Sequence, residues 1–157
     1  MINLKKIIKY IFYLVTPLIV GFLSNALTSN SRDFYKELIK PPLAPPGYLF
    51  GIVWTILFIL IGISYFLVKL KTEGIDISDI DFWYYLQLII NFFWSIFFFK
   101  NEALTFSFIW LVFLLIAVVI TFLKFYKVNK ISAYLLIPYI LWIIFAGYLN
   151  LSVAILN

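Results

Sequence analysis

The sequence has no cysteine and no histidine, and its one methionine is the first residue. These absences exclude disulfides, thiolate nucleophiles, metal sites built from cysteine or histidine, and acid–base catalysis by imidazole. Charged residues are also scarce, at 12% of 157 residues, where a soluble domain has about 25%. The sequence therefore gives no support to a soluble enzyme of a conventional kind.

Apolar residues are what the sequence has in excess: 65% are hydrophobic and 22% are aromatic, and the mean hydropathy is +1.08. A single soluble core of this size would leave far too much apolar surface in water. Lipid is the solvent that suits such a surface. We find no internal repeat and no low-complexity linker, so the chain is predicted to form one domain.

Five apolar runs bounded by charged residues are each long enough to cross a hydrocarbon core of roughly 30 Å, which takes about 20 helical residues. Unpaired backbone groups are too costly inside a bilayer, so each run is predicted to be helical. The first run is longer than the apolar core of a cleaved signal peptide, which predicts a retained helix. We therefore predict an all-α membrane protein, a five-transmembrane-helix bundle forming a single domain over 1–157, with helices at about 7–27, 48–67, 82–99, 103–123 and 131–156.

Lysine and arginine at the ends of the spans predict the orientation of the bundle, because they are enriched on the cytoplasmic side. Eight lie on the side of the N-terminus and four on the other side. We expect a cytoplasmic N-terminus and an external C-terminus in a bacterial cytoplasmic membrane. The same anchoring accounts for the net charge of +5, so nucleic acid is not an expected partner. The eight are Lys5, Lys6, Lys9, Lys69, Lys71, Lys124, Lys127 and Lys130, and the four are Arg32, Lys36, Lys40 and Lys100.

The first loop, 28–47, contains four of the six prolines, at Pro41, Pro42, Pro45 and Pro46. Proline fixes its own φ and biases the preceding residue toward extended geometry, so this loop is predicted to be stiff. It is either a rigid spacer or a lid folded across the helix bundle.

Neutral polar and aromatic residues recur at helical spacing inside the spans, whereas no ionisable residue lies in the middle of any span. That absence argues against ion-driven transport. The polar residues either join helices to one another or, together with the tryptophans, line a cavity for a flat apolar ligand. The four stripes are Gly21, Ser24, Asn25 and Thr28; Gly51, Trp54 and Phe58; Tyr84, Gln87, Asn91, Trp94 and Ser95; and Tyr139, Trp142, Ala146 and Asn150.

Several stretches, in order along the whole chain, resemble one known family. Residues 40–54 (KPPLAPPGYLFGIVW) resemble the first-loop and second-helix signature of the translocator protein/tryptophan-rich sensory protein family (TspO/MBR). Residues 91–95 (NFFWS) with Phe97 and Phe98 resemble its third-helix motif. Residues 136–142 (LIPYILW) with Leu149 and Asn150 resemble its fifth, and Asp33, Phe34 and Tyr35 lie where the family has an aromatic pair.

The resemblance implies a five-helix bundle, often a dimer, that binds porphyrins, haem and isoquinoline-type ligands in a pocket below the first loop. We accordingly expect a homodimer in the lipid bilayer whose ligand is a tetrapyrrole such as protoporphyrin IX or haem. No cofactor is expected to be required, and no metal site is expected. The ligand-binding residues that the resemblance implies are Tyr35 and Phe50 at the mouth and Trp54, Asn91, Trp94, Trp142, Ala146 and Leu149 in the pocket.

Three functions stay open at this point. The leading hypothesis is a membrane receptor for tetrapyrroles with a sensory or regulatory role, in which stacking replaces the missing axial ligands of haem iron. The second is light-dependent degradation of protoporphyrin, for which the resemblance implies Trp54 and Trp142 as the catalytic residues. The third is a transporter of porphyrin or lipid.

The sequence also departs from the family. The cholesterol motif that animal members carry at the end of the fifth helix is absent, because no lysine or arginine follows Lys130. Tyr48 and Phe92 replace tryptophans that are common in the family, so the strength of ligand stacking is expected to differ.

Overall fold

The computed structural model of the protein describes residues 3–31 and 33–157. Its elements, in chain order, are α1 (Leu4–Thr28), a 3-10 turn (Ser29–Ser31), α2 (Asp33–Glu37), α3 (Gly47–Lys71), α4 (Ser78–Ser95), a π-helical turn (Ile96–Lys100), α5 (Leu104–Val128), α6 (Lys130–Tyr134) and α7 (Ile137–Leu156). Arg32, which entered the orientation prediction, lies outside the described residues. The orientation itself stays a prediction.

Five helical stretches are long and apolar enough to cross a membrane: Leu4–Ser31, Gly47–Lys71, Ser78–Lys100, Leu104–Val128 and Lys130–Leu156. The predicted all-α, five-helix bundle is therefore confirmed for the part of the chain that the structure describes. Most of these stretches begin or end beyond the predicted limits, because a helix can continue into the interfacial zone where charged side chains are tolerated.

The last predicted span, 131–156, is divided between α6 and α7. Pro138 lies in the first turn of α7, where its missing N–H leaves no hydrogen bond unmade. At the break, the Leu136 N–H donates to the carbonyl of Ala133 at 2.9 Å. The Ser132 carbonyl accepts a hydrogen bond of 2.6 Å from the Ser64 hydroxyl of α3. The break thus becomes a point of attachment between α6 and α3.

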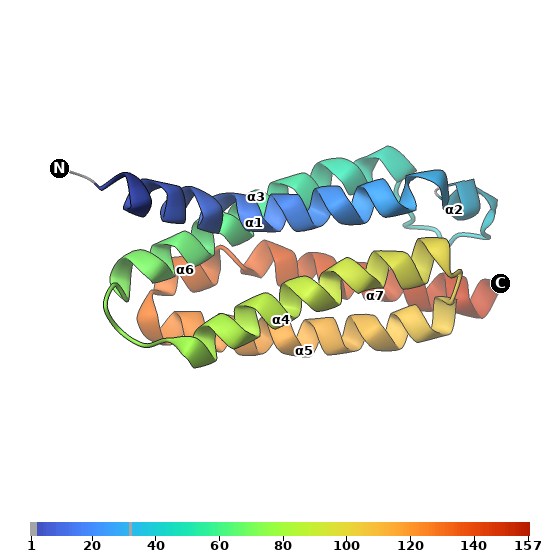
Figure 1. Ribbon diagram of the computed structural model, residues 1–157. Helices are drawn as coiled ribbons and strands as arrows, with labels where there is room; N and C mark the ends of the chain where they lie inside the picture. Colours follow the sequence, from blue (N-terminus) through green and yellow to red (C-terminus); the bar gives the residue numbers. More distant parts are fainter. Residues whose placement is uncertain (1–2, 32) are drawn as a thin grey trace.

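The helices form a single bundle, in which α1 lies between α3 and α4 in the order of contacts although α3 precedes α4 in the chain. Helix α1 packs against α3 and α4, α4 packs against α5, and α5 packs against α7. Figure 1 shows α1 and α3 along one side of the bundle and α4, α5 and α7 along the other. Helix α2 and the first loop lie at the end that also holds the C-terminus, and the N-terminus lies at the opposite end.

The outer faces of the helices are strongly apolar. Large hydrophobic side chains such as Ile8, Phe22, Phe113 and Ile155 are more than half exposed. In water such a surface would be an aggregation hazard, whereas in a bilayer it faces acyl chains. The exposed faces therefore fit a helix bundle surrounded by lipid.

The inner faces meet most tightly near the end that carries the N-terminus. The rings of Tyr65 on α3 and Tyr84 on α4 stack at 3.7 Å between centroids with 8° between planes, and Phe125 of α5 lies 6.2 Å from both. The Tyr65 hydroxyl donates to Asp81 at 2.8 Å, and Lys69 bonds the other oxygen of that carboxylate at 2.6 Å. Stacking and charge pairing together fix α3, α4 and α5 to one another here.

Helices α1 and α3 approach so closely that one contact leaves no room for a side chain. A Cβ atom built on Gly62 would overlap the backbone carbonyl oxygen of Leu14. Because that neighbour is backbone and not a flexible side-chain end, the helices themselves would have to move apart. Gly62 therefore sets the distance between α1 and α3.

We predict that Gly62→Ala lowers the stability of the bundle by about 1–3 kcal/mol, the usual cost of overpacking. Thermal unfolding in detergent, followed by circular dichroism, measures the effect. The matched control is Gly51→Ala on the same helix, where an added Cβ meets no atom within 4 Å. The control should unfold at the wild-type temperature or slightly above it, since alanine favours helix by about 1 kcal/mol over glycine. Equal midpoints for the two variants would contradict the prediction.

Candidate ligand-binding site

A cavity of about 1400 Å³ lies between α1, α3, α4 and the loop before α3. Small-molecule sites usually measure roughly 300–1,000 Å³, so this one has room for a large ligand. The lining residues come from four parts of the chain: Leu18, Gly21, Phe22, Ser24, Asn25 and Thr28 of α1; Tyr35, Lys36, Lys40, Ala44, Pro45 and Pro46 of α2 and the loop; Gly47, Tyr48, Phe50, Gly51, Trp54, Thr55 and Phe58 of α3; and Asn91, Trp94, Ser95 and Phe99 of α4 and the π-helical turn.

One wall of the cavity is aromatic. The rings of Trp54 and Phe58, one helical turn apart on α3, stack at 5.5 Å with 26° between planes. Trp94 of α4 lies 6.1 Å from Trp54 and stacks on Phe98 at 5.7 Å. Gly21 of α1 admits the Phe58 ring, because an added Cβ would overlap it. Aromatic faces of this kind suit a flat apolar ligand, which can stack on them in an offset or tilted arrangement.

Behind this wall, the amide of Asn91 is held by a buried hydrogen-bond chain. The Asn91 side-chain N–H donates to the Tyr139 hydroxyl at 2.9 Å, and that hydroxyl donates to the side-chain oxygen of Gln87 at 2.9 Å. All three residues are at most 3% exposed. The chain joins α4 to α7 and fixes how Asn91 faces the cavity.

Trp94 is held by a second buried network. Its indole N–H donates to the side-chain oxygen of Asn150 on α7 at 3.2 Å, and the Ser107 hydroxyl of α5 donates to the same oxygen at 3.1 Å. The Asn150 side-chain N–H donates to the Leu104 carbonyl at 2.8 Å. Because its only polar hydrogen is already used, Trp94 offers a ligand its ring face and not a hydrogen bond.

The first loop covers one end of the cavity and is tied down from within. The Tyr35 hydroxyl donates to the Pro45 carbonyl at 3.3 Å, and its ring meets the Phe50 ring at 5.4 Å, nearly edge-on. Burial raises the pKa of the Tyr35 hydroxyl. The Lys40 ammonium lies 5.1 Å from the centre of the Tyr35 ring and donates to the backbone carbonyls of Lys36 and Leu38. These contacts hold α2 and the loop together as a lid over this end of the cavity.

The last residue of the chain fastens the same loop from outside. The Ile39 N–H donates to the side-chain oxygen of Asn157 at 3.0 Å, and the side-chain N–H of Asn157 donates to the Ile39 carbonyl at 3.1 Å. Asn157 also donates to the Val153 carbonyl of α7 at 2.8 Å. One amide therefore connects the lid to the end of α7.

The charge at the cavity is positive and lies at its mouth. Among the described lining residues, the charged side chains are Lys36 and Lys40. Lys36 forms an exposed ion pair of 2.7 Å with Asp33 and lowers the pKa of that carboxyl. A ligand with an apolar body and an anionic edge would match an aromatic interior and a basic mouth.

The eight predicted ligand-binding residues divide into two groups. Five of them, Tyr35, Phe50, Trp54, Asn91 and Trp94, line the cavity. The other three, Trp142, Ala146 and Leu149, lie on α7 and are not lining residues. Their part in ligand binding, and a catalytic part for Trp54 and Trp142, stay predictions.

Trp142 lies beside the cavity wall. Its ring is 5.9 Å from Phe50, which does line the cavity, and its indole N–H is buried with no partner among the described residues. Ala146 and Leu149 are 3% and 5% exposed. Helical spacing placed Trp142 and Ala146 on the inward face of α7, and the family resemblance added Leu149. Neither says which neighbouring helix covers that face.

Sequence reasoning missed the two lysines at the mouth, because Lys36 and Lys40 served only to predict orientation. Their i, i+4 spacing directly before the proline stretch was the available signal. The α1 face of Gly21, Ser24, Asn25 and Thr28 was recognised as a stripe but not assigned to the site, and all four residues line the cavity.

Metal-ligating side chains do not gather in the part of the chain that the structure describes. Across residues 3–31 and 33–157, no three histidine, cysteine, aspartate or glutamate residues lie close enough to hold a metal ion. The cavity can therefore hold a ligand by stacking, apolar contact, hydrogen bonds and the lysines at its mouth.

Comparison with known proteins identifies the family from almost the whole length of the chain. Residues 13–156 match the TspO/MBR family. The chain belongs to this family. With its five spanning helices, this TspO/MBR protein is an integral membrane protein.

Named TspO/MBR relatives include bacterial, archaeal and animal proteins. The tryptophan-rich protein TspO of Chlorobaculum tepidum is 34% identical over 157 residues, which cover 98% of both chains. The protein of the same name from Archaeoglobus fulgidus is 35% identical over 97% of this chain and 99% of its own. The human translocator protein is 30% identical over 76% of this chain and 72% of its own.

We predict that Asn157→Ala loosens the lid of this TspO/MBR protein. Losing the pair of hydrogen bonds to Ile39, each worth about 1 kcal/mol, should speed hydrogen exchange at the Ile39 amide by about fivefold or more. Exchange measured by mass spectrometry in detergent, on a peptide that contains Ile39, checks this. The matched control is Asn101→Ala, an exposed amide in the loop before α5. Unchanged exchange in Asn157→Ala would show that the lid does not depend on this amide.

Proposed function

We propose that this protein is a membrane receptor that binds a porphyrin-type tetrapyrrole in the cavity below the first loop. The observation that carries the proposal is the aromatic wall of Trp54, Phe58 and Trp94 in a cavity of about 1400 Å³. A planar macrocycle presents a large flat apolar face to such a wall. Family membership supports the same ligand class.

Stacking is the expected main source of affinity. Burying one face of a macrocycle, on the order of 200–300 Å², at about 25 cal/mol/Å² contributes roughly 5–8 kcal/mol. Part of this is offset by the loss of freedom on association, so an affinity in the micromolar range is expected. Haem iron would receive no axial histidine, cysteine or methionine from this pocket, so a metal-free porphyrin should bind about as well as haem.

The basic mouth supports a ligand with carboxylate groups. Protoporphyrin IX carries two propionates on one edge of its ring. If the apolar edge of the ring lies against Trp54 and Trp94, the propionates would reach toward Lys36 and Lys40 at the lid. The apolar interior and the two lysines then recognise different parts of one molecule.

Replacement of Trp54 tests the pocket. Trp54→Ala should weaken protoporphyrin IX binding about tenfold, since it removes the central ring of the aromatic wall. Titration of the purified protein in detergent and in darkness, followed by the porphyrin absorption band, measures the dissociation constant. Trp83→Ala, on α4 but not among the lining residues, is the matched control and should bind as wild type does. Wild-type affinity in a folded Trp54→Ala protein would refute the pocket.

Replacement of the two lysines tests the basic mouth. The double variant Lys36→Gln, Lys40→Gln should weaken protoporphyrin IX binding about threefold to fivefold, because exposed ion pairs contribute up to about 1 kcal/mol. The dimethyl ester of protoporphyrin, which has the same ring without charge, is the matched ligand control. Its affinity should not change between wild type and the double variant. An equal loss for acid and ester would mean that the lysines shape the lid and do not pair with carboxylates.

A further inference from the structure

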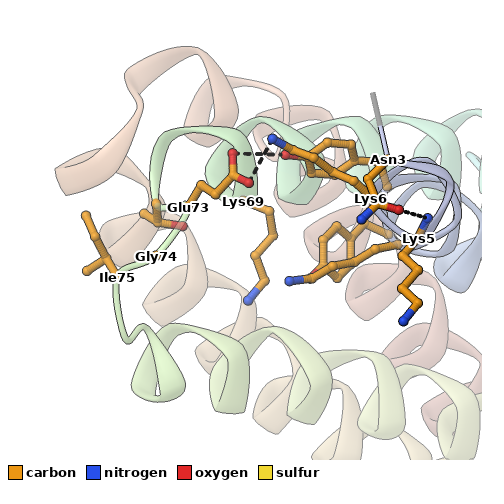
Figure 2. Close-up of a pocket in the computed structure, with 11 residues that line it drawn as sticks. Asn3, Lys5, Lys6, Lys69, Glu73, Gly74 and Ile75 are labelled. Carbon is orange, nitrogen blue, oxygen red and sulfur yellow. Dashed lines mark hydrogen bonds and ion pairs between the residues drawn. The ribbon is translucent and has the colours of Figure 1, made fainter. Parts of the chain in front are cut away.

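A second, smaller cavity lies at the opposite end of the bundle from the lid. It measures about 380 Å³ and is bounded by the first turns of α1, the last turns of α3 and the turn that follows α3 (Figure 2). Four of its lining side chains are lysines, Lys5, Lys6, Lys9 and Lys69, and one is a glutamate, Glu73. We call it the basic cavity.

The basic cavity has more positive charge than its carboxylates balance. Lys6 pairs with Glu73 at 2.8 Å, and Lys69 pairs with Asp81 of α4 at 2.6 Å. Lys5 and Lys9 have no carboxylate within 4.0 Å among the described residues. Figure 2 shows Glu73 reaching toward Lys6, while Lys5 points away from it.

Two of the lysines lie near the same aromatic ring. The ammonium groups of Lys9 and Lys69 lie 5.9 Å and 5.6 Å from the centre of the same ring, that of Tyr13. Asp81 already balances the charge of Lys69, whereas Lys9 has no carboxylate within 4.0 Å among the described residues, so an anion beside this buried ring would stabilise Lys9. The arrangement therefore favours an anion with several oxygens, such as a phosphate group, which can accept hydrogen bonds from more than one ammonium.

The surroundings of the basic cavity favour a lipid as the source of that phosphate. Ile75 lines the cavity and is 63% exposed, and Leu4 and Ile8, next to the lysines on α1, are 69% and 58% exposed. Such side chains face acyl chains at the end of a membrane span. The phosphate group of a lipid is attached to acyl chains, which can contact Leu4, Ile8 and Ile75, whereas free phosphate has no such chains.

We propose that the basic cavity binds the phosphate headgroup of an anionic phospholipid from the leaflet around the N-terminal end of the bundle. Lys5 and Lys9 contact the phosphate oxygens, and Leu4, Ile8 and Ile75 contact the upper part of the acyl chains. Basic pockets between helices at a membrane surface are a general means of recognising anionic headgroups. The basic cavity shares no lining residue with the tetrapyrrole cavity.

The test measures binding of phosphatidylglycerol and phosphatidylcholine to the protein in detergent by native mass spectrometry. Wild type should bind phosphatidylglycerol more tightly than phosphatidylcholine. Lys5→Gln and Lys9→Gln should each weaken phosphatidylglycerol binding about fivefold. Lys71→Gln, an exposed lysine at the same end of α3 that does not line the cavity, is the matched control and should bind as wild type does.

Glu73→Gln distinguishes a binding role from a structural one. The hydrogen bond from Lys6 lowers the pKa of the Glu73 carboxyl, so this group is ionised and competes with an incoming phosphate. Its replacement removes the competitor and releases Lys6. Phosphatidylglycerol should therefore bind about fivefold more tightly to Glu73→Gln, even though an ion pair has been lost.

Three outcomes would overturn the proposal. The first is equal binding of phosphatidylglycerol and phosphatidylcholine, and the second is an equal loss of phosphatidylglycerol binding in Lys9→Gln and Lys71→Gln. The third comes from inorganic phosphate, tested by its effect on the thermal midpoint in detergent. If free phosphate protects wild type as strongly as phosphatidylglycerol at the same concentration, the cavity takes a soluble anion and the lipid assignment fails.

Discussion

A buried polar side chain without a partner inside the bundle is costly, because the surrounding hydrocarbon offers none. Two networks supply such partners, one through Tyr139 and one through Asn150, and both run from α4 to α7. They fix the rotation of α4, and α4 carries Asn91 and Trp94 into the cavity wall. The shape of the cavity therefore depends on hydrogen bonds that lie behind it.

Two residues of the polar stripes both join helices and line the cavity. Asn91 uses a side-chain N–H to join α4 to α7 and still lines the cavity. Trp94 does the same with its indole N–H and its ring. A sequence pattern shows that such a residue faces inward, but it does not show how its polar atoms are divided between a neighbour and a ligand.

Hydropathy and charge predicted the five spans, because the cost of exposed backbone in lipid leaves helices as the solution for runs of this composition. The prolines of the first loop predicted that it is stiff, but they did not decide between a spacer and a lid. The positions of Trp142, the pair of Asn157 with Ile39 and the basic cavity could not be predicted, since each depends on the distance between segments far apart in the chain. Glu73 and Lys6 are one example: only the packing of α1 against α3 brings them together.

In mechanical terms, the break between α6 and α7 is restrained from bending and does not act as a hinge. The Ser64 hydroxyl holds the Ser132 carbonyl next to the break, so bending there would cost a buried hydrogen bond. Helix α6, which leads into α7, is thus attached to α3, and the far end of α7 is joined to the lid through Asn157. Movement that admits a ligand is then left to the lid and to α1, which buries the smallest share of its residues among the five spans.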